Sequence, residues 1–212
     1  AVQFSQEIHH QEAMVDSYAK WSYKIERVEN ASLVMTRAFQ IAASEPCGVS
    51  YLTYPMEVAL APLSGGLVYD AADFAPATIG EGERDALREA ARLLVEARSP
   101  VVLVKGMGRH PEAVPHLVAL AEKLALPVTS NSKYMNLPRT HWANSSPTVD
   151  TRDVILVIDN DIPWTTTDPP KGCKIISLDA DPLQSRCPMN GTPVHIPITC
   201  NSAKALPLLN QM

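Results

Sequence analysis

Residues 100–127 constrain the fold of this chain more than any other stretch of the sequence. The stretch begins with four consecutive apolar residues, 101–104, and continues through a turn that contains Gly106 and Gly108. Residues 114–124 then carry apolar side chains at helical spacing. An apolar run without alternation is typical of a strand buried on both faces, and a single apolar stripe indicates a helix that lies on a sheet. The order of strand, tight turn and helix therefore predicts an α/β unit.

The rest of the C-terminal part contains further short apolar runs, separated by polar segments. This repetition predicts an α/β fold with a Rossmann-like parallel sheet of about six strands, flanked by helices. Pro197 suits an edge strand, because proline cannot donate a hydrogen bond to a ladder. The predicted strands after 101–104 are 127–130, 154–158, 174–178 and 194–198, and the predicted helices besides 114–124 are 81–97 and 202–209.

The N-terminal part predicts a smaller, partial α/β segment. Asn30 is a suitable N-cap for a helix at 31–44, and 49–54 is typical of a single strand. We expect the aromatic residues around Trp21 to form a packing surface. Residues 62–80 contain several glycines and prolines, show little periodicity and exceed an ordinary loop in length, so we predict a linker. The predicted organisation is a first domain at 1–61, a linker at 62–80 and a second domain at 81–212.

Composition and charge exclude several classes of function. The formal net charge of -5 provides no basic patch, so nucleic acid is not an expected partner. No apolar run approaches the roughly 20 residues that span a bilayer, and no signal peptide opens the chain, so we expect a cytoplasmic protein without membrane association. The cysteines are far apart and form no CxxC pair, which favours free thiols over a disulfide or zinc framework.

Small and acidic residues recur at the carboxyl ends of the predicted strands. In an open parallel sheet these ends share one rim, where ligands bind. A carboxylate at such a position can accept hydrogen bonds from ribose hydroxyls, and glycines permit close approach of a ligand. The alternative is that the acids cap turns and satisfy loop N–H groups. The candidate nucleotide-binding residues are Gly106, Gly108, Thr129, Ser130, Asn131, Asp179 and Asp181.

The sequence contains no recognisable catalytic motif. The GxSxG nucleophile motif and the HExxH zinc motif are both absent. His195 lies within a predicted strand, so we interpret it as a packed or edge histidine. We therefore predict no catalytic residue and no metal ligand in this chain.

The order of four segments resembles the acetolactate synthase-like family of thiamine diphosphate-dependent enzymes. TRAFQIAASEPCGVSYLTYPMEVALAP is similar to the end of that family's pyrimidine-binding domain. VVLVKGMGRHPEAVPHLVALAEKLALPVTSN looks like the start of its central domain, and DVILVIDNDIPW and KIISLDADPLQSR are similar to later strands. The resemblance implies that 1–61 is the end of the first domain and 81–212 the central domain.

The resemblance also implies where the chemistry of such an enzyme lies. In the family, the glutamate that activates thiamine diphosphate precedes the position of Ala1, and the magnesium motif follows that of Met212. The chain is thus expected to be a fragment that is inactive alone, with thiamine diphosphate and magnesium bound outside it. The parent enzyme would decarboxylate or ligate 2-oxo acids as a transferase or lyase. Its expected partners are the remaining domains and further copies in a homo-oligomer.

Some central domains of this family bind FAD, others bind ADP and many bind no nucleotide. The candidate residues named above are the positions that the resemblance assigns to the nucleotide in those members that bind one. Two departures argue against FAD. The flavin-binding members carry Gly-x-Arg where this chain has 159–161, so Asp161 stands where an arginine meets the pyrophosphate; this exchange costs on the order of 1 kcal/mol or more. Cys200 and Asn201 replace a Gly-Asp pair before the last helix. The alternative to an enzyme fragment is a stand-alone Rossmann-like nucleotide-binding or structural module.

Overall fold

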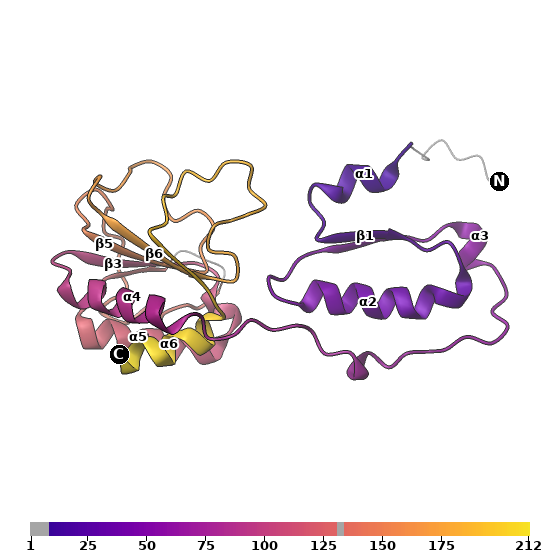
Figure 1. Ribbon diagram of the computed structural model, residues 1–212, viewed down its shortest axis with the longest axis horizontal. Coiled ribbons are helices and arrows are strands. Elements are labelled where there is room, and N and C mark those ends of the chain that lie inside the picture. The colour runs from indigo at the N-terminus through magenta and orange to yellow at the C-terminus, as the bar shows by residue number, and fades with distance from the viewer. Residues whose placement is uncertain (1–8, 131–133) are drawn as a thin grey trace. The chain divides into compact units, whose positions relative to one another are not determined.

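The computed structural model describes residues 9–130 and 134–212. The chain divides into two compact units, unit 1 at Ala1–Thr78 and unit 2 at Ile79–Met212, and both are drawn in Figure 1. Within the described residues, no helix is both long enough and apolar enough to cross a bilayer.

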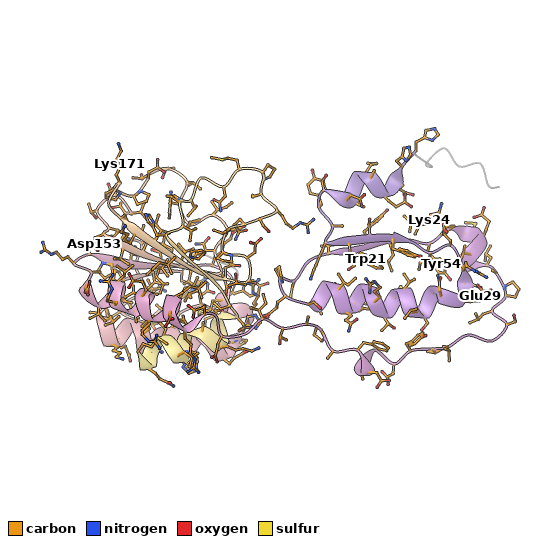
Figure 2. The ribbon with its side chains drawn as sticks, in the orientation of Figure 1. Trp21, Lys24, Glu29, Tyr54, Asp153 and Lys171 are labelled. Carbon is orange, nitrogen blue, oxygen red and sulfur yellow. The ribbon has the colours of Figure 1, made fainter. Side chains whose placement is uncertain are left out.

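Unit 1 is a small α/β unit around a two-stranded parallel sheet, in which Trp21 lies opposite Ser50. The prediction of one strand in this part was therefore incomplete, because the segment around Trp21 forms a second strand. Figure 2 labels Trp21 on this strand, where its ring stacks on that of Tyr23 and lies under the guanidinium of Arg37. The elements of unit 1 are α1 (Gln11–Asp16), β1 (Trp21–Lys24), η1 (Val28–Asn30), α2 (Ala31–Ala43), β2 (Ser50–Thr53), α3 (Met56–Ala59) and η2 (Ala71–Asp73).

A lysine caps the carboxyl end of α2. Lys20 Nζ donates hydrogen bonds to the carbonyl oxygens of Ile41, at 2.8 Å, and Ser44, at 2.7 Å. The last carbonyls of a helix lack partners within it, and a cation is favourable near the negative end of the helix dipole. Gly48 permits the approach, because a Cβ on it would lie 2.9 Å from Lys20 Cβ.

Part of the predicted linker is an ordered strap on α2. Residues 69–77 follow one side of the helix and are hydrogen-bonded to polar side chains of α2 and of Ser44, the residue that follows it. The contacts are Tyr69 N–H to Ser32 Oγ at 3.0 Å, Gln40 Nε2 to the Ala75 carbonyl at 3.0 Å, and Ala77 N–H to Ser44 Oγ at 2.9 Å. The three polar side chains are eight and four residues apart in the sequence. Because their hydrogen bonds hold 69–77 against α2, this part of the predicted linker belongs to unit 1.

Unit 2 confirms the predicted parallel α/β fold. Its sheet has five parallel strands in the order β4-β3-β5-β6-β7, where about six were expected. His195 precedes β7, and its Nδ1 accepts a hydrogen bond from the N–H of Ile175 at 3.2 Å. The elements are α4 (Arg84–Glu96), β3 (Pro100–Val104), η3 (Met107–Arg109), η4 (Pro111–Ala113), α5 (Val114–Leu124), β4 (Val128–Ser130), β5 (Val154–Ile158), β6 (Lys174–Asp179), β7 (Ile196–Thr199) and α6 (Ser202–Gln211).

The two faces of the unit 2 sheet are covered differently. Helices α4, α5 and α6 pack on one face, as Figure 1 shows, and form the larger core with residues such as Val102, Leu156 and Ile176. On the other face, a smaller cluster of sheet residues packs with Val149 and Trp164, which lie on irregular segments. Because both faces of the sheet are buried, its central strands consist largely of apolar residues without alternation. All four cysteines are thiols and form no disulfide; Cys173 and Cys200 are buried, whereas Cys47 and Cys187 are exposed.

Candidate functional site

The strand order places a topological switch point between β3 and β5. The chain passes outward from β3 to β4, then returns to the other side of β3 with β5. Ligands of open α/β sheets bind outside the carboxyl ends of the strands at such a point. The residues that meet there are Lys105, Gly106, Arg109, Asp159 and Asp161, which we call the β3–β5 corner.

The structure places the predicted site residues around this edge of the sheet. Gly106 lies at the β3–β5 corner and Gly108 lies in η3 beside it. Thr129 and Ser130 end β4. Asp179 ends β6, and Asp181 follows it. The remaining candidate, Asn131, lies outside the described residues.

Backbone carbonyl groups from other parts of the chain pack closely against Gly106 and Gly108. A Cβ on Gly106 would lie 3.0 Å from the carbonyl oxygen of Asp159, and a Cβ on Gly108 would lie 2.5 Å from that of Met135. Neither glycine has the positive φ that would by itself require glycine. Close packing between the turn after β3 and two neighbouring loops therefore explains both glycines.

A buried amide that the sequence analysis missed holds this turn. Asn136 has no exposed surface, and its Oδ1 accepts a hydrogen bond from Gly108 N–H at 2.8 Å. Its Nδ2 donates to the carbonyl of Lys105 at 2.9 Å, with a longer contact of 3.3 Å to Ser130 Oγ. One side chain thus joins the turn after β3 to the end of β4.

Asp159 is the most buried acid of the corner, with its side chain 4% exposed. Its Oδ1 lies 3.2 Å from Nη2 of Arg109, and its Oδ2 accepts a 2.6 Å hydrogen bond from Ser202 Oγ. Ser202 is the first residue of α6, so the carboxylate lies at the positive end of that helix dipole. The backbone of Asp159 has φ +45°, in the left-handed region.

The second acid of the corner is also paired. Asp161 contacts Nζ of Lys105, and this hydrogen bond lowers the pKa of the Asp161 carboxyl group below its ordinary value. From the sequence, we expected Asp161 to repel a pyrophosphate. The structure adds that Arg109 and Lys105 each provide a cation to one of the two acids.

The two acids at and just after the end of β6, Asp179 and Asp181, have different surroundings. Burial raises the pKa of Asp179; the hydrogen bond from Asp181 N–H opposes this shift, and the charge of Asp159 adds to it. The carboxylate of Asp181 accepts hydrogen bonds from Ser185 N–H at 2.8 Å and Ser185 Oγ at 2.7 Å. This geometry corresponds to the turn-capping interpretation of both acids.

The carboxyl edge has a small pocket next to the corner. It is lined by Asn160, Asp161, Ser177, Gln184 and Thr192, among others, and its volume of about 10 Å³ corresponds to a single water molecule. Thr129 Oγ1 is buried and has no partner among the residues that the structure describes. Across 9–130 and 134–212, no group of three or more His, Cys, Asp or Glu side chains is arranged to hold a metal ion.

No family model matches the sequence. The chain is 30% identical over 115 residues to acetolactate synthase of Bacillus subtilis, an alignment that covers 54% of this chain and 20% of that protein. It is 34% identical over 133 residues to the acetolactate synthase large subunit of Mycobacterium tuberculosis, which covers 59% of this chain and 23% of the relative. The matched segment thus spans about a fifth of the length of these curated relatives.

Solved structures match over nearly the whole chain. Benzoylformate decarboxylase from Polynucleobacter necessarius superposes with a TM-score of 0.75 at 21% identity, over 95% of this chain and 40% of that one. A thiamine diphosphate-dependent 4-hydroxybenzoylformate decarboxylase from Rhodococcus jostii gives a TM-score of 0.70 at 20% identity, over 92% and 39%. The chain is therefore a part-length homologue of acetolactate synthases, with the fold of part of a thiamine diphosphate-dependent enzyme.

Proposed function

We propose that this chain is the scaffold portion of a thiamine diphosphate-dependent enzyme that acts on 2-oxo acids. Unit 2 would serve as the central domain and unit 1 as the end of the pyrimidine-binding domain. The observation that carries the proposal is the agreement of fold over 92% of the chain with a thiamine diphosphate-dependent 4-hydroxybenzoylformate decarboxylase. Sequence identity of 30–34% to acetolactate synthases supports the same assignment.

The described residues suit a supporting role. The acids and cations of the β3–β5 corner are engaged with one another, and Asn136 is fully buried between two loops. Thiamine diphosphate supplies the carbanion chemistry when it is bound, and the metal ion and cofactor would be held by residues outside this chain. This chain's contribution would be to hold neighbouring domains in position, in a homo-oligomer.

The intact mass of the gene product from its native cells tests this proposal. We expect a protein comparable in length to the solved benzoylformate decarboxylase, of which this chain covers 40%. A native product of 23.1 kDa would instead support the stand-alone module. The same sample should bind thiamine diphosphate with Mg²⁺ in a calorimetric titration, and failure of an intact, longer product to bind them would also contradict the proposal.

A further inference from the structure

We propose that the chain's own groups fill the place at the β3–β5 corner where a nucleotide diphosphate would bind, so that unit 2 takes neither FAD nor ADP. Asp159 is the central residue of this arrangement. The proposal concerns unit 2 alone and does not depend on the reaction of a larger enzyme.

Three N–H groups of the turn after β3 are already engaged. Gly106 N–H donates to the carbonyl of Asp159 at 2.8 Å, and Gly108 N–H donates to Asn136 Oδ1 at 2.8 Å. Arg109 N–H donates to the Gly106 carbonyl at 3.1 Å. A phosphate cradle needs such N–H groups directed at the ligand. Three of them here are committed to protein acceptors.

Backbone carbonyl groups occupy the side of each glycine on which a Cβ would lie. A methyl group in place of the glycine hydrogen would lie 2.5 Å from the Met135 carbonyl oxygen at Gly108, and 3.0 Å from that of Asp159 at Gly106. Glycine in a dinucleotide-binding turn permits close approach of the pyrophosphate to the backbone. In this chain, the absence of a Cβ at the two glycines instead allows two backbone carbonyl groups to approach closely.

A protein carboxylate occupies the position of an anion. Asp159 lies at the amino end of α6, bonded to Ser202 and paired with Arg109. A helix amino end favours negative charge, and here the favourable charge is supplied by a side chain that is 4% exposed. A diphosphate at the corner would have to displace this buried carboxylate from its partners or lie beside it.

The acids and cations of the corner balance each other. Lys105 pairs with Asp161, and Arg109 pairs with Asp159, so the two pairs carry no net charge. Asp179 adds a further, partly buried carboxyl group near Asp159. The corner therefore lacks the excess positive charge that attracts phosphate groups.

The test uses the full chain, with isothermal titration of ADP and FAD and with thermal unfolding in the presence of each ligand. We expect no saturable heat and no rise of Tm with millimolar ADP or with FAD. Asp159→Asn should lower Tm by about 3–8 °C, because it removes the charge from a buried, paired carboxylate. The control Asp161→Asn should lower Tm by less than about 2 °C, because its pair with Lys105 is half exposed.

Saturable binding of ADP or FAD by the wild-type chain would overturn the proposal. So would an Asp159→Asn variant that unfolds at the same temperature as Asp161→Asn, since Asp159 would then not be the central residue. If Asp159→Asn does not fold, Ser202→Ala replaces it, because this variant removes one hydrogen bond and keeps the Arg109 pair. Ser202→Ala should lower Tm and leave ADP unbound, and a wild-type Tm would contradict the account.

Discussion

The carboxylate of Asp159 accepts a 2.6 Å hydrogen bond from the hydroxyl of Ser202, a residue that lies 43 positions further along the chain. The contact joins the end of the central strand β5 to the start of the last helix, α6. Arg109 also pairs with Asp159. Protein groups thus contact one another at the edge of the sheet where α/β proteins bind ligands. The consequences of this arrangement are testable at several positions.

Asn136→Ala should destabilise unit 2 by about 1–3 kcal/mol, because it leaves Gly108 N–H and the Lys105 carbonyl without their buried partner. Urea unfolding followed by circular dichroism measures this free energy. Asn190→Ala is the matched control, because its Oδ1 accepts a local hydrogen bond from Thr192 N–H at 3.0 Å on an irregular segment. Equal stability of the two variants would show that the Asn136 amide does not hold the turn.

Asp179→Asn should stabilise the protein at neutral pH. Burial raises the pKa of Asp179, so the ionised carboxyl group is less favourable in the folded than in the unfolded chain. Its contribution to stability is therefore lost as the pH rises through the folded-state pKa. An asparagine at this position keeps an acceptor for Asp181 N–H and cannot ionise.

The measurement for Asp179 is Tm at about pH 4, close to the ordinary pKa of an aspartate, and at neutral pH, for the wild type and two variants. The advantage of Asp179→Asn should be larger at neutral pH, whereas Asp168→Asn, at an exposed position, should show no such difference. An advantage that is independent of pH would contradict the assigned titration.

The four cysteines should divide into two classes of reactivity. Cys47 and Cys187 are exposed and should react at once with a thiol reagent such as Ellman's reagent. Burial raises the pKa of Cys173 to about 11, and Cys200 is fully buried, so both should react only after denaturation. Rapid reaction of more than two thiols in the native protein would show that the unit 2 core opens.

Lys20→Met should weaken the last turn of α2, because it removes two hydrogen bonds from the helix carboxyl end while keeping the apolar stem. Loss of this cap is expected to cost about 1 kcal/mol. Hydrogen exchange read by mass spectrometry should be faster in peptides from α2. Lys24→Met, at an exposed position of β1, is the control, and unchanged exchange in Lys20→Met would refute the capping role.

The sequence predicts those parts of the fold that local patterns determine. The continuous apolar runs of β3 and β5, and the largely apolar centre of β6, identify strands buried on both faces, and the structure contains all three strands in one sheet. Gly106 and Gly108 mark the turn after β3 correctly. Their packing partners, the carbonyls of Asp159 and Met135, are distant in sequence and leave no local signal.

The elements that were missed depend on contacts between distant segments. The four-residue β1, in which Trp21 and Tyr23 alternate with polar residues, is too short for a clear period and exists through its pairing with β2. The strap at 69–77 has no periodicity of its own and is held by side chains of α2 and the residue that follows it. Asn136 lies in an irregular polar segment, and nothing in its neighbours signals a buried amide.

We propose that this chain is a scaffold and that the chemistry of its parent enzyme lies outside it. The most direct test is release of carbon dioxide and formation of acetolactate from pyruvate by the pure 212-residue chain, supplied with thiamine diphosphate and Mg²⁺. We expect a rate equal to that of the same mixture without protein. Product formation that depends on the chain and on thiamine diphosphate would contradict it.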